Sequence, residues 1–301
     1  MPTEYSEQAS RAASLIWILI AYILCFAAAS YYLVYLNYFG DLLIDSFAAD
    51  TIATVVIFAF SRLFKNSSFY DAYWSVFPPF LLVFWWTHKH MDADTTRFIM
   101  ISIVVWLWAI RLTWNWTKHW TGLHHEDWRY GMLKDGMPKL EMFTDFFGIH
   151  YFPTIQVFLG MIPVYACLVL SDAPLNWLDY VAFVLGVAAS IIQLVSDRQL
   201  HDFIAVRKPG QIIEHGLWAY SRHPNYFGEL LLWFSLGVFG LAAYPEGWWW
   251  QMIGFVAMLL MFMLASIPMM EKRSLERRPE YQATIDKISM VFPWPQKKPK
   301  A

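Results

Sequence analysis

Residues 13–37 read ASLIWILIAYILCFAAASYYLVYLN and contain no charged side chain. A helix needs about 20 consecutive apolar residues to cross the hydrocarbon core of a bilayer, so this stretch is long enough to span a membrane. Further apolar stretches follow it along the chain. We therefore expect it to stay in the protein as a membrane anchor, and not to be removed as a signal peptide.

The apolar stretches together predict an all-α integral membrane protein with about eight (seven to eight) transmembrane helices in one bundle. Two of them are less clean than the rest, because Asp71, Pro78 and Pro79 interrupt one and Arg111 interrupts another. The predicted spans are 13–37, 41–61, 68–87, 97–115, 149–171, 176–196, 225–244 and 247–269.

The composition agrees with this class. Of the 301 residues, 58% are hydrophobic and only 15% are charged, against about 25% charged in soluble proteins. These values exclude an ordinary soluble domain and a disordered chain. The net charge of −2 gives no sign of a nucleic-acid partner. Cys25 and Cys167 both lie inside apolar stretches and are expected to be core residues.

The basic residues predict the orientation in the membrane. Cytoplasmic loops collect Lys and Arg. If the N-terminus is cytoplasmic and the chain crosses eight times, 20 of the 22 basic residues fall on that side, and only Lys89 and Arg97 do not. We expect both termini and the two long polar loops, 116–148 and 197–224, to be cytoplasmic.

The segment with the richest chemistry is 196–229, SDRQLHDFIAVRKPGQIIEHGLWAYSRHPNYFGE. Pro224 suits the first turn of a helix, where its missing N–H has no partner to lose. The span that follows would direct its positive N-terminal end toward the cytoplasm. With Arg207, Lys208 and Arg222 close by in the sequence, this end is a candidate anion site.

Glu229 falls about one turn inside the predicted span, on the same helix face as Asn225 and Trp233. An ionisable residue within a membrane is costly and indicates function by default. The alternative is structural: Arg207 and Arg222 anchor the topology, and Glu229 pairs with one of them inside the bundle. The sequence leaves both interpretations open.

The stretch GLWAYSRHPNYFGELLLW, with SDRQ and VRKPG before it and EKRSLERRPEYQATIDKISMVFPWP after it, carries a resemblance. It resembles the C-terminal signature of membrane steroid 5-alpha-reductases, sterol reductases and isoprenylcysteine methyltransferases. The steroid 5-alpha-reductase C-terminal domain family is the most similar, in an uncharacterised bacterial branch. About 100 residues match well, and DAYW at 71–74 with RLTWNW and HEDWRY in 111–130 matches more weakly.

The resemblance implies reduction of an activated carbon–carbon double bond, usually an enone in a steroid- or isoprenoid-like substrate, by hydride from NADPH. It also implies a bacterial inner-membrane enzyme whose cofactor site faces the cytoplasm. The positions that match cofactor-binding positions of the family are Asp197, Arg207, Tyr220, Arg222, His223, Asn225, Tyr226, Glu229, Arg273 and Tyr281.

The proton donor for the substrate oxygen is less defined. The Gln-Glu pair of steroid 5-alpha-reductases does not occur in the N-terminal half of this chain. Asp71 is the carboxylate that falls within the predicted span 68–87, and burial would raise its pKa and let it act as an acid. The neighbouring Tyr70 is the second candidate for the proton donor. Asp71 as a helix cap or a bundle-bonded side chain is the alternative.

The run HEDWRY at 125–130 resembles a metal cluster only superficially. His124, His125 and Glu126 have no partner ligands at helical spacing, so no metal site is expected. We expect Arg129 in this run to pack on the nucleotide, or else to order the membrane interface.

Two regions are expected: residues 1–148 on the substrate side, and 149–301 as the cofactor-binding, reductase-like region. The expected partners are a lipophilic substrate and membrane lipids, with no obligate protein partner. A methyltransferase that uses S-adenosylmethionine is the first alternative, although that cofactor has no phosphate for the arginines. A non-enzymatic membrane protein is the second, although it would not need its polar residues gathered on one side.

Overall fold

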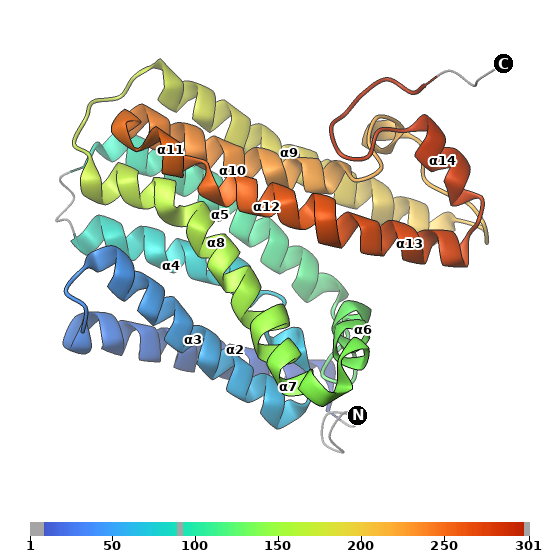
Figure 1. Cartoon of the computed structure of the whole chain (residues 1–301), viewed down its shortest axis with the longest axis horizontal. Helices are drawn as coiled ribbons and strands as arrows, with labels where there is room; N and C mark the ends of the chain where they lie inside the picture. Colours follow the sequence, from blue (N-terminus) through green and yellow to red (C-terminus); the bar gives the residue numbers. More distant parts are fainter. Residues whose placement is uncertain (1–8, 89–92, 298–301) are drawn as a thin grey trace. The chain divides into compact units, whose positions relative to one another are not determined.

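The computed structural model describes residues 9–88 and 93–297. These residues form helices joined by turns and loops, with no strand among them. Seven helical segments in this part of the chain are long and apolar enough to cross a membrane. The predicted all-α membrane fold is therefore confirmed, with the number of spans at the lower end of the expected range (Figure 1). The segments are Arg11–Leu36, Leu42–Phe64, Thr95–His119, Pro138–Leu170, Trp177–Val206, Pro224–Ala243 and Pro245–Arg277.

The predicted span 68–87 differs from the structure. Its helix, α4 (Tyr73–His88), has 16 residues, because the chain first makes a short 3₁₀ turn at Ser67–Phe69. At 1.5 Å per residue this helix is about 24 Å long, less than the roughly 30 Å of a hydrocarbon core. Asp71 therefore precedes the helix and does not lie within it.

The chain divides into two compact units, which are described separately. The first comprises the described residues of 1–90 and 108–161, and the second those of 91–107 and 162–301. The division falls within two helices, α5 (Thr95–His119) and α8 (Phe152–Tyr165), so each contributes residues to both units.

In the first unit, α2 (Arg11–Tyr31) packs along α3 (Leu42–Phe64). Asp41 caps α3 by accepting a hydrogen bond from the backbone N–H of Ile44 at 2.9 Å. Aromatic rings join α2 to α4, as in the stacked pair Phe26–Phe77 with centroids 5.9 Å apart. Further helices of this unit include α6 (Trp128–Gly136), α7 (Glu141–Phe143) and the π-helical segment η4 (Thr144–Tyr151).

In the second unit, α9 (Trp177–Val206) packs antiparallel along α10 (Pro224–Ala243). Gly228 permits the close approach, because a Cβ there would lie 2.6 Å from Cγ of Gln193. At the other end of α9, Arg97 and Asp179 form a fully buried ion pair with an Nε–Oδ1 distance of 2.7 Å. The chain continues through α11 (Trp248–Gln251), α12 (Ile253–Met261), α13 (Ile267–Arg277) and α14 (Tyr281–Lys287).

Candidate functional site

The RHPNY residues lie where α10 begins in the second unit. Pro224 is the first residue of the helix, as expected from its sequence position. The three residues before it, Ser221, Arg222 and His223, are all buried. Buried polar groups are nearly always hydrogen-bonded, so these residues should have hydrogen-bond partners in the segments packed around the motif.

The guanidinium nitrogens of Arg222 all donate hydrogen bonds to groups within the protein. Its Nε lies 2.7 Å from Oε1 of Glu271 on α13, and its Nη2 lies 3.2 Å from Oε2 of the same carboxylate. Its Nη1 donates to the backbone carbonyls of Ile285 and Ile288. With only 7% of the residue exposed, the guanidinium joins the start of α10 to α13 and to the C-terminal segment.

The chain after α14 folds back onto the turn that precedes α10. The backbone N–H of Trp294 donates to the carbonyl of Tyr220 at 3.0 Å, and the N–H of Arg222 donates to Ser289 at 2.8 Å. Lys287 also forms an ion pair with Glu214. Two stretches of the predicted cofactor-binding region that are far apart in the sequence, 196–229 and 271–297, are thus in direct contact.

The carboxylate of Glu271 contacts two of the predicted cofactor residues and acts electrostatically on a third. Besides Arg222, it has Nε2 of His223 at 3.1 Å from its Oε1. Tyr281 is buried as well, and this burial, with the negative charge of Glu271, raises the pKa of Tyr281 to about 12. The ring of His223 stacks on Tyr226, which stacks in turn on Phe262 with centroids 4.5 Å apart.

Glu229 is 5% exposed and is hydrogen-bonded by neutral groups. Its Oε2 accepts from Nε2 of Gln193 on α9 at 2.6 Å, and its Oε1 accepts from the indole N–H of Trp233 at 3.0 Å. The carboxylate that pairs with Arg222 is Glu271.

The other predicted cofactor residues of this unit lie nearer to solvent or lipid. Arg207 and Tyr220 are exposed, whereas Asp197, Asn225 and Arg273 are half-buried. Arg207 ends α9, and its backbone N–H caps that helix by donating to Phe203. Arg207 therefore offers a cation at the surface of the unit.

In the first unit, Asp71 lies in the turn before α4 and is half-buried. Its Oδ1 accepts from the hydroxyl of Tyr130 at 2.5 Å, and its Oδ2 accepts from the indole N–H of Trp116 at 3.1 Å. Burial raises the pKa of Asp71 to about 6, although the Tyr130 hydrogen bond acts in the opposite direction. Arg129, on the same helix as Tyr130, pairs with Asp127 with an Nη2–Oδ2 distance of 2.8 Å.

Tyr70 belongs to a separate chain of buried hydroxyl groups. Its hydroxyl lies 2.8 Å from Oγ1 of Thr154, which lies 2.9 Å from Oγ1 of Thr54. Thr54 reaches the hydroxyl of Tyr73 at 3.4 Å, and Tyr73 donates to Oδ1 of Asp50 at 2.7 Å. A path of hydroxyl groups therefore joins Tyr70 to a second buried carboxylate.

Sequence patterns alone did not predict a role for Asp50, Gln193 or Glu271. Asp50 and Gln193 are polar residues inside apolar spans, a signal that was available and that indicates function or packing. Glu271 stands among many charged residues in EKRSLERR, so nothing local distinguishes it.

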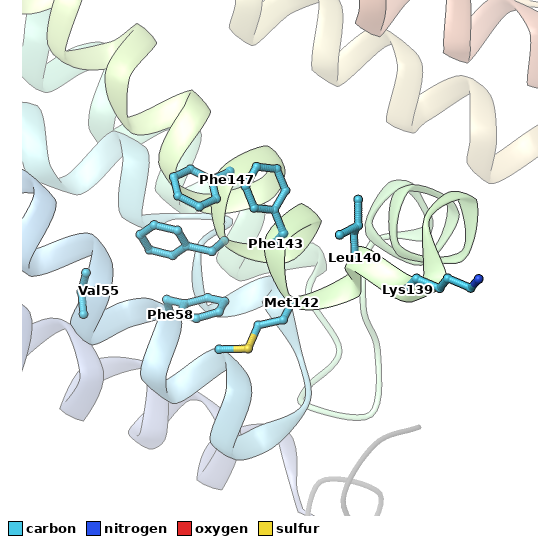
Figure 2. A pocket seen from close by; sticks show the side chains of 8 residues that line it. Val55, Phe58, Lys139, Leu140, Met142, Phe143 and Phe147 are labelled. Carbon is cyan, nitrogen blue, oxygen red and sulfur yellow. The ribbon is translucent and has the colours of Figure 1, made fainter.

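The first unit also has two neighbouring hollows. One is an apolar groove of about 610 Å³, shown in Figure 2, which Phe58 of α3 lines together with Phe143 and Phe147, while the Lys139 ammonium points away from the rings. The other is a polar pocket of about 620 Å³. The charged residues that line the pocket are Arg62, Lys65, Lys134, Glu126, Asp135, Glu141 and Asp145.

Within residues 9–88 and 93–297, no group of three or more His, Cys, Asp or Glu side chains could hold a metal ion. His124 and His125 therefore have no metal-ligand set around them in the described structure.

A family model described as "Protein of unknown function (DUF1295)" matches residues 57–288, a range that includes every candidate residue predicted from the sequence. The chain is also similar to Uncharacterized protein C594.04c of Schizosaccharomyces pombe (strain 972 / ATCC 24843). The two are 26% identical over 262 residues, which cover 79% of this chain and 76% of that protein. No solved structure matches the chain significantly.

Proposed function

The chain belongs to the DUF1295 family, and we propose that it is a membrane-embedded reductase that uses NADPH to reduce an enone in a lipophilic substrate. The family is steroid 5-alpha-reductase-like, which supports this class of reaction. The match of GLWAYSRHPNYFGELLLW, residues 216–233, to the reductase signature supports it as well.

The observation that carries the proposal is the arrangement around Glu271. Arg222 and His223 both contact this carboxylate, so two side chains join the beginning of α10 to α13. The N-terminal end of a helix favours anions through its N–H groups and dipole. The exposed cations Arg207 and Lys208 precede this end in the same loop, and a phosphate-bearing nucleotide suits that combination.

NADPH supplies the hydride when it is bound. In our proposal Arg207 and Arg273 bind its phosphates, while Asp197, Tyr220 and Asn225 hydrogen-bond its ribose and amide groups. Arg222 acts by fixing the start of α10, because its guanidinium is already hydrogen-bonded to Glu271 and to two backbone carbonyls. Glu229 orients the amide end of the cofactor from within the helix.

Asp71 donates the proton in this proposal. Hydride addition to an enone places negative charge on the carbonyl oxygen, and a positioned acid relieves that charge. With a pKa of about 6, the carboxyl of Asp71 holds its proton in mildly acidic conditions. Tyr130 and Trp116 both donate to it and fix its orientation.

The proposal is tested by titrating NADPH into the purified protein in nanodiscs, with energy transfer from tryptophan as the signal. Arg207→Ala should weaken binding by about 1.5–3 kcal/mol, the worth of a charge-assisted hydrogen bond. The matched control is Arg198→Ala, an exposed arginine of α9 that faces Asp202 at 3.9 Å. Equal losses in both variants would reject Arg207 as a phosphate ligand. S-adenosylmethionine binding without NADPH binding would exclude the reductase and favour the methyltransferase.

A further inference from the structure

The apolar groove and the polar pocket of the first unit are built from the same two segments. From α3, Val55 and Phe58 line the groove, and Ser61 lines the pocket one helical turn later. Segment 139–147 also lines both hollows, because Phe143 lines the groove and Asp145 lines the pocket. Apolar and polar linings therefore follow one another along the same pair of elements.

A ring contact with the buried His150 lies between the two hollows. The ring of Phe58 meets the ring of His150 edge-on with centroids 5.2 Å apart. Nε2 of this histidine lies 2.8 Å from Oγ of Ser61, and its Nδ1 lies 2.8 Å from the backbone oxygen of Asp145. A carbonyl oxygen can only accept, so Nδ1 carries the proton and Ser61 donates to Nε2. The Ser61 oxygen keeps lone pairs to accept a further hydrogen bond.

The charges of the pocket restrict its ligand. Three basic and four acidic residues line it, and several are already paired, such as Arg62 with Glu141 and Lys134 with Glu126. An anionic group would meet an excess of carboxylates. Lys134 uses two of its three N–H groups on Ser67 and Glu126, which leaves one donor for a neutral acceptor.

We infer that the groove and the pocket together bind one lipophilic molecule with a neutral polar head. Its apolar body lies in the groove, and its hydroxyl or carbonyl end accepts from Lys134 or donates to Ser61. Each volume lies within the roughly 300–1,000 Å³ of ordinary ligand sites. The inference rests on the proposed function only in naming this molecule the substrate, because the binding itself needs neither NADPH nor turnover.

The test is photo-crosslinking in nanodiscs with a long-chain alcohol that carries a diazirine in its tail, mapped by peptide mass spectrometry. Saturable labelling is expected in 55–58 and 139–147. The carboxylic acid of the same chain, used where it is ionised, should label about tenfold less because of the surrounding carboxylates. Val55→Trp, which fills the groove from a half-exposed position, should abolish saturable labelling.

Ile44→Trp is the matched control, at a similarly exposed position of the same helix, and should label like the parent. If Val55→Trp fails to fold, Met142→Trp blocks the groove from its other wall. Unsaturable labelling spread over other helices, or equal labelling by the acid, would overturn the site. Saturable labelling in a protein that does not bind NADPH would keep the site and reject the reductase.

Discussion

Arg222 and Glu271 form a bidentate, buried ion pair that joins the beginning of α10 to α13 in the second unit. Both residues belong to stretches that resemble a cofactor-binding signature. Their charged groups nevertheless pair with each other, and Arg222 also donates to two backbone carbonyls. The pair fixes the position of the motif, whereas Arg207 is exposed at the surface of the unit.

Removing one partner of this pair should unfold the second unit more readily. Arg222→Ala or Glu271→Ala leaves a buried charge without its counter-charge, which costs about 3–5 kcal/mol. Thermal melting in detergent should show this as a lower Tm for both variants. Lys272→Ala, an exposed neighbour, is the control and should melt like the parent. A parent-like Tm for Arg222→Ala, with lost NADPH affinity alone, would instead make this arginine a direct phosphate ligand.

Asp71→Asn tests the proton donor. It preserves the shape but removes the acid, so the chemical step should slow by about 10²–10⁴-fold with NADPH affinity unchanged. A single-turnover rate within a few-fold of the parent would remove Asp71 from the mechanism. The buried pair Asp50–Tyr73 would then be the next candidate.

The pH dependence of this step follows from the raised pKa of Asp71. The folded state holds this proton up to a pH of about 6, so activity should be present below that pH and fall as the pH rises through it. Between the ordinary pKa of 3.8 and about 6 the folded state binds more protons than the unfolded state, so stability also falls with rising pH. In Asp71→Asn, the free energy of unfolding should no longer fall with rising pH between about 3.8 and 6.

The orientation depends on α4. Both termini can be cytoplasmic only if this 16-residue helix completes an eighth crossing. Single cysteines at Lys65 and Asp94, which flank α4, should then be labelled from opposite sides of the membrane by an impermeant maleimide. Cys25 and Cys167 are buried and should stay unlabelled. Labelling of both new cysteines from one side would establish seven crossings and place the termini on opposite sides.

Most of the helical framework could be predicted from hydropathy, because a long apolar run such as 13–37 has one way to satisfy its backbone in lipid. The start of α4 could not, since a 3₁₀ turn at Ser67–Phe69 depends on local hydrogen bonds that hydropathy ignores. The site follows the same division. The sequence singles out Arg222 and His223 as a motif, whereas Glu271, which holds both, lies 49 residues beyond Arg222 and has no local signal.

In our proposal, the loop of residues 207–223 and the start of α10 hold a phosphorylated nicotinamide nucleotide. This binding is tested most directly by native mass spectrometry of the full chain, purified in mild detergent, followed by identification of the bound nucleotide. We expect NADP(H) in the parent protein and its loss in Arg207→Ala but not in Arg198→Ala. S-adenosylmethionine or its demethylated product in place of NADP(H) would contradict it.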